Sequence, residues 1–350
     1  MINTEDPMKS KEMKLRKAKK PGRRKTVLIA TSVILAQFLI ASFVSLLLVT
    51  RGPFDIIRKN LIGTAMTTFS HQYIAKILFS QKQIDEVLNE GKNIKANSQK
   101  ELDVTPQNHN DPNISMISIT SKTGSYSGYL LEISDPLRVK VAYTQFLKKS
   151  GENTSSMAER NDAVAAINGG GFTDVAWAGT GAYPSDFVIS DGELVYKDQN
   201  LSDKTECNVI ALNAKGQLIV GDHSLYELQN ESVKIMNAVT LSGCQPLVVN
   251  GKGTYKSEGS TSFGGIQPRT AIGQKQDGTI LMLVLDGRRL NMPGASLYDV
   301  QTILQNYGAY TASYLDGGNS STMYYDGQVI NNPSGEFGER PSATAFYVTK

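Results

Sequence analysis

The sequence predicts an α+β fold: a mixed β-sheet domain with few helices, preceded by one N-terminal transmembrane helix. Three observations lead to this prediction. A basic tail precedes a long apolar run, residues 27–50, which contains no charged side chain. From residue 113 onward, short β-rich runs alternate with glycine-containing turns. Helical periodicity is sparse there, and no internal repeat is evident, so we interpret residues 113–350 as one domain.

Positive charge is concentrated at the N-terminus. The formal net charge of the chain is +3, yet residues 1–25 hold ten Lys or Arg against three acidic residues, which makes +7. The remaining residues therefore sum to −4. Because the basic excess is confined to a tail, we expect no nucleic-acid partner for the folded part.

The apolar run predicts a membrane anchor at residues 26–50. Its 24 residues would span roughly 36 Å as a helix, which is enough to cross a bilayer. Lys and Arg are dense before the run and sparse after it, so the positive-inside rule places the N-terminus in the cytoplasm and the rest outside the cell. A cleaved signal peptide is the first alternative, but the run is long and no clear small-x-small site follows. A helix buried in a soluble core is the second, and the basic flank argues against it.

The sequence pattern of residues 51–112 predicts a helical stalk followed by a polar linker. Apolar residues recur with helical spacing between Asp55 and Leu88, which also suits a partner-binding helix. Residues 90–111 are polar and include Gly91 and Pro106. The predicted organisation is thus a basic tail (1–25), an anchor (26–50), a stalk and linker (51–112) and an outer domain (113–350).

Turn dipeptides and capping residues predict the elements of the outer domain. Four Asp-Gly or Asn-Gly pairs are strong hairpin signals, and they begin at Asp191, Asn250, Asp277 and Asp326. Helices are expected at residues 154–161 and 296–307. The second begins with Ser296 and Asp299, a pair that resembles a capping box.

The segment from Arg269 to Arg288 is the most informative one. A two-residue turn at Asp277-Gly278 would place Arg269 directly opposite Asp286 at the open end of a hairpin. Residues 280–285 are apolar on both faces, so the hairpin should lie in the centre of a sheet. Charged residues would then lie at the rim of the core.

A β-α-β unit is expected next, formed by residues 280–285, the helix 296–307 and residues 310–315. If its strands are parallel, Asp286 and Asp316 both lie just past the carboxyl end of a strand. Crevices at such sheet ends are where open α/β sheets bind ligands.

Glycine-rich corners with polar residues occur at four predicted strand borders. Asp316 opens LDGGNSS, in which free backbone N–H groups could form an anion nest beside two serine hydroxyls. An apolar run ending at Ile167 is followed by NGGGF, and Arg340 precedes a final strand at residues 343–348. Each border alone is weak: Asp-Gly after a strand is usually a turn, and Asp286 with Arg288 could be a structural ion pair. The repeated theme makes convergence on one pocket the better interpretation.

Together these segments resemble the phosphodiester glycosidase family, whose animal member, the "uncovering enzyme", removes N-acetylglucosamine from a phosphodiester. Four blocks match in order: NGGGF at residues 168–172, PRTAIG at 268–273, DGR at 286–288 and LDGG-x-SS at 315–321. GERP at 338–341 and the final strand complete the pattern, which covers about residues 150–350. Asn319 stands where the family usually has a third glycine, and the NGGGF block carries one glycine more than is common.

The resemblance implies a hydrolase that breaks the bond between a sugar anomeric carbon and a phosphodiester oxygen. Its implied catalytic residues are Asp286, Asp316 and Arg269, with either aspartate as nucleophile or base. Its implied substrate- and phosphate-binding residues are Asn168, Gly169, Gly170, Arg288, Gly317, Gly318, Ser320, Ser321 and Arg340.

No cofactor is established by the sequence. Asp286 and Asp316 are hard oxygen ligands, so a divalent cation such as calcium is one expectation. The three histidines are widely spaced, and neither H-E-x-x-H, C-x-x-C nor G-x-S-x-G occurs, which argues against a catalytic zinc site or a serine triad. Cys207 and Cys244 could pair or remain buried thiols.

The expected partner is a glycosyl phosphodiester or another anionic polysaccharide, and the expected place is the cell membrane, with the catalytic domain outside. This topology suits an envelope protein that trims exopolysaccharide or cell-wall glycopolymer. Two other functions fit the same sequence: a non-catalytic binder of anionic surface polymers, and a scaffold that acts through residues 55–88.

Overall fold

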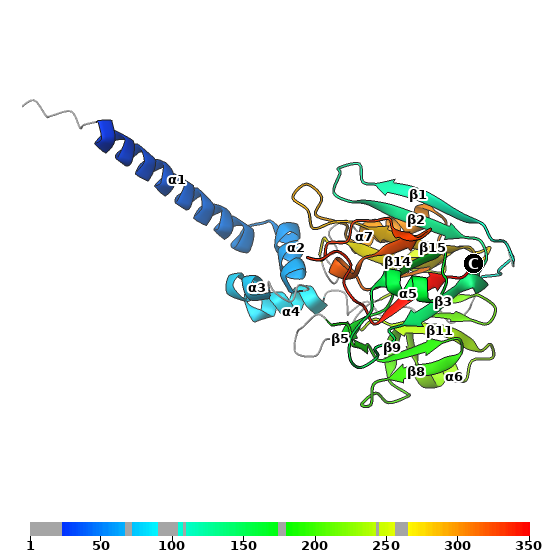
Figure 1. The fold of residues 1–350 in the computed structure, drawn as a ribbon. Coiled ribbons are helices and arrows are strands. Elements are labelled where there is room, and N and C mark those ends of the chain that lie inside the picture. The colour runs from blue at the N-terminus through cyan, green and yellow to red at the C-terminus, as the bar shows by residue number, and fades with distance from the viewer. Residues whose placement is uncertain are drawn as a thin grey trace, which may run out of the picture. The chain divides into compact units, whose positions relative to one another are not determined.

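A computed structural model describes residues 23–66, 72–89, 104–107, 110–173, 180–242, 245–255 and 265–350. The predicted basic tail and polar linker lie largely outside these residues, and so does Cys244. The chain divides into two compact units, Met1–Phe54 and Asp55–Lys350. The α+β class is confirmed, and so is a long apolar helix near the N-terminus (Figure 1).

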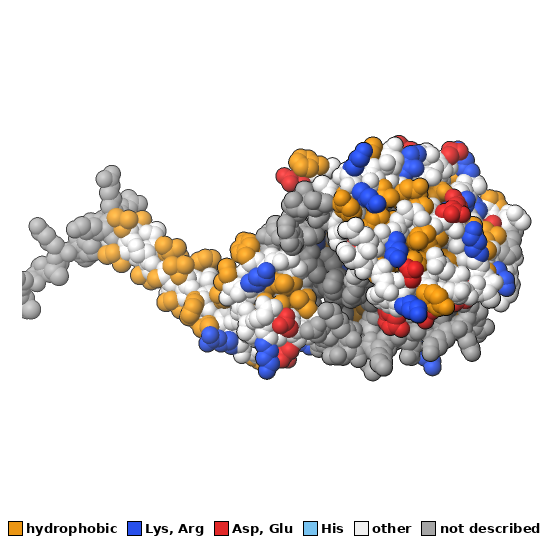
Figure 2. All heavy atoms as spheres, turned by 90° about the horizontal axis from the view of Figure 1, so that it is seen from below, with side chains coloured by type: hydrophobic (Ala, Val, Ile, Leu, Met, Phe, Trp, Pro, Cys, Tyr) orange, Lys and Arg blue, Asp and Glu red, His pale blue; other side chains and the backbone are white. Residues whose placement is uncertain are grey.

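Helix α1 (Arg23–Arg51) contains that apolar stretch. Its segment Thr26–Arg51 is long and apolar enough to cross a membrane, a property that signal sequences share. Figure 2 shows hydrophobic side chains along its length. Leu28 and Phe38 are among its exposed large hydrophobic residues. The Thr31 hydroxyl donates 3.0 Å to the Val27 carbonyl, so this polar side chain is satisfied within the helix, as an apolar surrounding requires.

Three short helices open the second unit: α2 (Asp55–Met66), α3 (Gln72–Leu78) and α4 (Gln81–Asn89). The helical prediction for residues 55–88 is confirmed, as three helices that pack together around Ile62, Phe79 and Ile84. Ser80 separates α3 from α4: its amide donates 3.0 Å to the Gln83 side chain, and its hydroxyl accepts from the Gln83 amide at 3.3 Å. This capping box starts a new helix where one continuous helix would otherwise run on.

The β-rich part contains three sheets and a two-stranded ribbon, and every pairing among its described strands is antiparallel. The seven-stranded sheet has the order β1 (Ile114–Thr120), β2 (Ser127–Ile133), β15 (Ile280–Leu285), β14 (Arg269–Gln274), β16 (Thr311–Tyr314), β12 (Val248–Val249), β13 (Lys252–Gly253). One five-stranded sheet has the order β10 (Leu218–Ser224), β9 (Glu206–Asn213), β11 (Ile235–Thr240), β7 (Phe187–Ser190), β8 (Glu193–Lys197).

The other five-stranded sheet has the order β18 (Gln328–Val329), β17 (Met323–Tyr325), β4 (Ala165–Asn168), β19 (Thr344–Val348), β3 (Val139–Tyr143). The ribbon pairs β5 (Phe172–Thr173) with β6 (Tyr183–Pro184). Helices of this part are α5 (Thr154–Arg160), α6 (Leu225–Gln229) and α7 (Leu297–Asn306), with 3-10 turns η1 (Pro136–Arg138) and η3 (Gly318–Ser320). Figure 1 shows α7 beside the seven-stranded sheet and α6 beside the sheet that contains β8 and β9.

One apolar core joins all three sheets. It contains Leu130, Ile210, Leu283 and Phe346, one residue each from β2, β9, β15 and β19. Every residue of β14 and β15 is buried, which confirms that this hairpin lies at a sheet centre. The site-bearing loops therefore extend from a rigid, fully packed scaffold.

Hairpins form at all four predicted turn dipeptides. The turns at Asp191, Asn250 and Asp326 are two-residue turns in which both positions, the residue and its glycine, have positive φ. This conformation is the one that matches the twist of antiparallel strands, and it explains why Asn-Gly and Asp-Gly occur there.

The predicted register of the fourth hairpin is wrong. Arg269 pairs with Leu285, one position away from Asp286. The turn uses three residues, 276–278: the Lys275 amide donates 2.9 Å to the Thr279 carbonyl, and of the three only Gly278 has positive φ. The Asp277 carboxylate accepts from the Thr279 amide at 2.9 Å, which favours this longer turn. A slip of one residue changes every cross-strand partner, so Arg269 and Asp286 do not form a pair.

The predicted β-α-β unit is confirmed. Strands β15 and β16 both pair antiparallel with β14, so they run in the same direction with β14 between them. The capping box of α7 is present: the Asp299 amide donates 3.1 Å to the Ser296 hydroxyl, and the Ser296 amide donates 2.8 Å to the Asp299 carboxylate. Asp286 and Asp316 thus each follow the carboxyl end of a strand.

Helix α5 confirms the helix expected near residues 154–161, whereas α6 was not predicted. The latter also begins with a capping box, Ser224 with Glu227, and this S-x-x-E pattern is visible in the sequence.

Candidate active site

Asn168 joins the ends of three strands through its buried side chain. Its Oδ1 accepts from the Thr270 hydroxyl at 2.7 Å and from the Thr322 amide at 3.1 Å. Its Nδ2 donates 2.6 Å to the backbone carbonyl of Asp316. The ends of β4, β14 and β16 are therefore held at one place, as convergence required. Asn168 serves the fold here as a positioning residue, and its predicted substrate contact stays a prediction.

The glycines after Asn168 allow close backbone packing. A Cβ on Gly170 would lie 2.5 Å from the Thr240 carbonyl oxygen, so no larger residue fits there. The amides of Gly169, Gly170 and Gly171 all donate within the chain, to Thr344 and Thr240. These three N–H groups already donate to the protein's own oxygen atoms, so in this structure they are not free to form the anion nest expected at this corner. Phosphate binding by Gly169 and Gly170 stays a prediction.

The loop after β16 carries Asp316, Gly317 and Gly318 against the same corner. The Asp316 amide donates 3.1 Å to the Gly169 carbonyl, and the Gly318 amide donates 2.9 Å to the Pro268 carbonyl. Gly318 has φ +65, a left-handed conformation that glycine adopts without strain. The amides of Ser320 and Ser321 also donate within the loop, and anion binding by this loop stays a prediction.

Arg288 is the guanidinium that reaches this loop. Its Nη1 donates 2.6 Å to the Asn319 side chain, and its Nη2 donates 3.0 Å to the side chain of Gln267. Arg288 has φ 57, which is unusual for a residue other than glycine. Burial lowers the pKa of Arg288, whereas the neighbouring Asp316 raises it and Arg340 lowers it further.

Arg340 approaches the same carboxylate from the segment before β19. Its guanidinium lies over the ring of Phe172, 4.7 Å from the ring centroid, so this aromatic residue supports the cation. The charges of Arg340 and Arg288 both act on Asp316. Two positive groups therefore face one carboxylate, an arrangement whose net charge favours an anion.

Asp316 is the strongly perturbed acid of the cluster. Burial raises its pKa above the ordinary value of 3.8, and this effect outweighs the lowering by Ser320, Arg340, the Gly317 amide and Arg288. The residue is half-buried, and desolvation is the largest influence on the pKa of its carboxyl group. The Ser320 hydroxyl lies near enough to lower this pKa, although it stops short of hydrogen-bond geometry. Perturbed carboxyl groups of this kind are typical of active sites.

Shortly after Asp316 in the chain, three consecutive residues carry hydroxyl groups. Those of Ser320, Ser321 and Thr322 are buried and have no hydrogen-bond partner within the described structure. Ser320 is the one of the three that acts on the Asp316 carboxyl group. Buried polar groups are nearly always bonded, so three unbonded hydroxyls in this loop indicate a place for ligand or water. Ser320 and Ser321 were predicted as binding residues, and the structure brings both to the Asp316 corner.

The guanidinium of Arg269 bonds backbone carbonyls of two other segments. The residue is buried, its Nε donates 3.0 Å to the Ala295 carbonyl, and its Nη2 donates to the Gly265 carbonyl. The backbone and the side-chain Cδ of Arg269 both lie beside Gly317. The side chain thus holds two loops together, and its predicted catalytic role stays a prediction.

Asp286 is also held apart from the Asp316 cluster. Its carboxylate accepts from the Asn331 side chain at 2.9 Å and from the Asn332 amide at 3.1 Å, and it lines a separate pocket. The structure therefore brings together Asn168, Asp316, Arg288, Arg340 and the glycine-rich loop. Asp286 instead lines a neighbouring pocket.

Sequence reasoning did not anticipate the partners of Arg288. Gln267 stands just before the PRTAIG block, and this adjacency is the signal that could have indicated it. The sequence marked Asn319 only as the residue that stands where the family usually has a third glycine. In the structure Gly318 takes a left-handed conformation and Asn319 does not, while the Asn319 side chain orients Arg288 and accepts 2.9 Å from the Ser334 hydroxyl.

No group of three His, Cys, Asp or Glu side chains suited to a metal is found among the described residues. Two guanidiniums beside Asp316 also make that carboxylate a poor cation site. Calcium binding stays an untested expectation. Cys207 is a buried free thiol, and burial raises its pKa to about 12.

Known proteins resemble this chain over the part that carries these residues. A sequence model of the phosphodiester glycosidase family matches residues 161–349. The uncharacterized protein YomE, derived from prophage SPbeta of Bacillus subtilis strain 168, is 29% identical over 187 residues, which are 52% of this chain and 27% of that protein. The chain thus spans about a quarter of that relative's length.

Among solved structures, the catalytic domain of a zebrafish enzyme has a similar fold. The enzyme is N-acetylglucosamine-1-phosphodiester α-N-acetylglucosaminidase, in a form auto-inhibited by pro-peptide. The TM-score is 0.55 at 22% identity, covering 70% of this chain and 87% of the zebrafish chain. At this identity the likeness concerns the fold.

Proposed function

The chain belongs to the phosphodiester glycosidase family, and from this premise we propose that it is a membrane-anchored hydrolase acting outside the cell. Its substrate is a glycosyl-1-phosphodiester in exopolysaccharide or cell-wall glycopolymer, and its product is a free sugar similar to N-acetylglucosamine. Family membership supports the glycosidase class of reaction. The sugar, the polymer and the membrane location are our proposal.

Hydrolysis of a glycosyl phosphodiester requires an anion-binding site beside a carboxyl group. The bond between C1 and the phosphate oxygen breaks, positive charge develops on the sugar, and the phosphate monoester leaves with that oxygen. The oxygen of water ends on C1. A phosphate monoester is already a weak base, so it needs neutralisation of its charge more than it needs a proton. Arg288 and Arg340 supply this charge, and the orphan hydroxyls of Ser320 and Ser321 add hydrogen bonds.

Asp316 is the residue we assign to the reacting carbon. Its carboxyl group lies within reach of both guanidinium charges and is desolvated, and burial raises its pKa. It acts either as the base for water or as a nucleophile that forms a glycosyl intermediate, and the anomer of the product distinguishes inversion from retention. The observation that carries the proposal is this convergence of a desolvated acid, two guanidiniums and three orphan hydroxyls.

The proposal is tested by hydrolysis in water enriched in ¹⁸O. The full chain in detergent is given N-acetylglucosamine-1-phosphate methyl ester, and both products are analysed by mass spectrometry. We expect the label in the sugar and none in methyl phosphate. Label in the phosphate would mean P–O cleavage and would overturn the glycosidase assignment.

Variants connect the reaction to the site. Arg288→Ala and Arg340→Ala are each expected to lower kcat/KM by about 10² to 10³, since each removes charge from the leaving group. Asp316→Asn should abolish turnover and retain substrate binding. Arg58→Ala is the matched control, because Arg58 pairs with Asp55 on α2 and belongs to no part of the cluster. A wild-type chain that binds glycosyl phosphodiesters without hydrolysing them would indicate a non-catalytic binder instead.

A further inference from the structure

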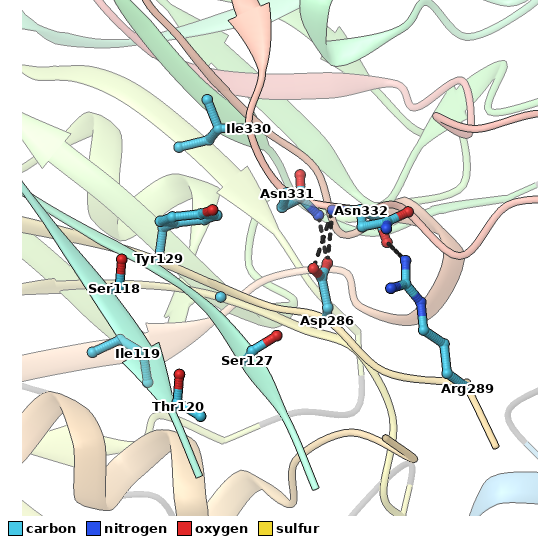
Figure 3. Close-up of a pocket in the computed structure, with 11 residues that line it drawn as sticks. Ser118, Ile119, Thr120, Ser127, Tyr129, Asp286, Arg289, Ile330, Asn331 and Asn332 are labelled. Carbon is cyan, nitrogen blue, oxygen red and sulfur yellow. Dashed lines mark hydrogen bonds between the residues drawn. The ribbon is translucent and has the colours of Figure 1, made fainter. Parts of the chain in front are cut away.

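A hollow lies beside the Asp316 cluster. It has a volume of about 450 Å³ and is lined by the outer strands β1 and β2 on one side and by residues 330–332 on the other (Figure 3). None of Asn168, Arg288, Asp316 or Arg340 is among its described lining residues. We call this hollow the Asp286 pocket, after the carboxylate in its wall.

The lining of the Asp286 pocket is mainly polar and comes from two sources. Strands β1 and β2, which precede the segment that matches the family, contribute Ser118, Thr120, Ser127 and Tyr129. The family-matched segment contributes Asp286, Arg289, Asn331 and Asn332. Figure 3 shows Tyr129 and Ser118 on neighbouring strands, with Tyr129 toward Ile330 and Asp286 toward the two asparagines.

Asp286 is a fixed acceptor in this wall. The Asn331 side chain donates 2.9 Å to its Oδ1, and the Asn332 amide lies 3.1 Å from both carboxylate oxygens. The Asp286 amide donates 2.7 Å to the Ser127 carbonyl, which ties the residue to β2. Two carboxylate oxygens offer about four lone pairs, so this carboxylate retains capacity for a ligand hydroxyl.

The charges in the pocket balance. Asp286 is negative, and the exposed Arg289, whose Nη2 lies 3.5 Å from the Asn332 carbonyl, is positive. The Asp316 cluster, in contrast, has two guanidiniums for one carboxylate. Hydroxyl and amide groups, one aromatic ring, and one carboxylate matched by one guanidinium suit an uncharged polyhydroxyl ligand better than a phosphate.

The two sites are joined by residues 331–334. Asn331, which bonds Asp286, also donates 3.0 Å to the Ser321 carbonyl at the end of the glycine-rich loop. Ser334 donates 2.9 Å to Asn319, the partner of Arg288. A ligand in the Asp286 pocket therefore lies next to the loop that carries the proposed phosphate site.

From this juxtaposition we propose that the Asp286 pocket binds an uncharged sugar unit of the glycopolymer, adjacent to the phosphodiester that the Asp316 cluster holds. The substrate's place in a polymer rests on the function proposed above, whereas binding of a neutral sugar does not. The proposal makes Asp286 a sugar-binding residue and leaves Asp316 to the reacting carbon.

The kinetic test compares two substrates of the full chain in detergent. One is N-acetylglucosamine-1-phosphate methyl ester, and the other carries a hexose in place of the methyl group. Ser118→Trp would fill the pocket from an exposed position, and Tyr129→Ala removes the ring. Each is expected to raise KM for the hexose ester about tenfold and leave the methyl ester unchanged, as loss of one or two contacts would. Tyr73→Ala, an exposed tyrosine on α3, is the matched control.

Equal changes for both substrates, or no change for either, would overturn the proposal. If the wild type hydrolyses neither substrate, the proposed function fails, and the pocket is tested by saturation-transfer NMR with a methyl hexoside. Binding that Ser118→Trp abolishes and Tyr73→Ala preserves supports the pocket. Absent binding, or binding that survives Ser118→Trp, refutes it. The two failures are therefore distinguishable.

Discussion

At the scale of single residues, Gly318 makes room for the guanidinium of Arg288. A Cβ at this position would lie 2.8 Å from Arg288 Nη2 and 3.1 Å from its Cζ. Its φ of +65 would also strain any larger residue. The absence of a side chain at Gly318 thus allows the Arg288 guanidinium to take its position.

We predict that Gly318→Ala lowers kcat/KM by about tenfold or more, because the displaced guanidinium no longer faces the leaving phosphate. Gly327→Ala is the control. Gly327 has a similar positive φ, +85, with no atom within 4 Å of the added Cβ, so only backbone strain remains. Kinetics and thermal unfolding of both variants separate the effects. Equal loss of activity in the two would refute the role assigned to Gly318.

Asp316 couples the site to stability through its ionisation. Burial raises its pKa in the folded chain above the ordinary value of 3.8, so the folded state binds the proton more tightly than the unfolded state. The contribution of Asp316 to the free energy of unfolding is therefore fully present below that ordinary pKa. It is lost as pH rises through the folded-state pKa of Asp316.

We predict that Asp316→Asn is more stable than the wild type at pH 8, because the variant has no carboxylate to desolvate. The difference should vanish at pH values well below 3.8, where Asp316 is protonated in the folded and the unfolded chain alike. Urea unfolding of both proteins from about pH 3 to pH 8 measures it. A variant less stable than the wild type at pH 8 would contradict the buried, raised-pKa description of Asp316.

At the scale of elements, α7 shows how a local cap supports the site. Ser296 caps the helix and directly follows Ala295, whose carbonyl accepts from Arg269. The helix connects β15 to β16, so it sets where Asp286 and Asp316 emerge. Its amphipathic pattern and its capping box are both local features of sequence.

We predict that Ser296→Ala destabilises the chain by about 1 kcal/mol, the usual loss for an N-cap hydroxyl. For a unit of this size the midpoint of thermal unfolding should fall by roughly 2–4 °C. Ser296→Thr retains a capping hydroxyl and should recover most of the stability. Calorimetry compares the three proteins, and an unaffected midpoint in Ser296→Ala would mean that the cap contributes nothing.

At the scale of the whole molecule, the large apolar surface of α1 is stable only where an apolar environment surrounds it. Its side chains Leu28, Ile34 and Phe38 are all more than half exposed, and the helix forms part of a unit separate from the β-rich one. Solvation of such a surface by water is unfavourable, whereas a bilayer accepts it.

We predict that the full chain sediments with membranes, resists alkaline carbonate and is released by detergent. Protease added outside intact cells should degrade the β-rich unit and spare an epitope placed before residue 23. Release of a chain shortened at its N-terminus, identified by N-terminal sequencing, would show that the helix is a cleaved signal sequence instead.

Several features of this protein are local, and the sequence alone determined them. Turn dipeptides at Asp191, Asn250 and Asp326 specify backbone conformations directly, and so does the capping pair Ser296 and Asp299. The apolar run of α1 and the two-faced apolar strand β15 likewise identify themselves by composition. The ordered blocks around Asp286 and Asp316 were sufficient to indicate the family.

Only the tertiary structure decided which charged residues meet. The extra residue in the turn at Asp277 separated Arg269 from Asp286, and hydrogen bonds from Asn331 and Asn332 drew Asp286 to its own pocket. The glycine amides proved to be bonded to strands distant in sequence, such as β11 and β19. Contacts of this kind depend on register and on long-range packing, where a shift of one residue changes every partner, so no local pattern records them.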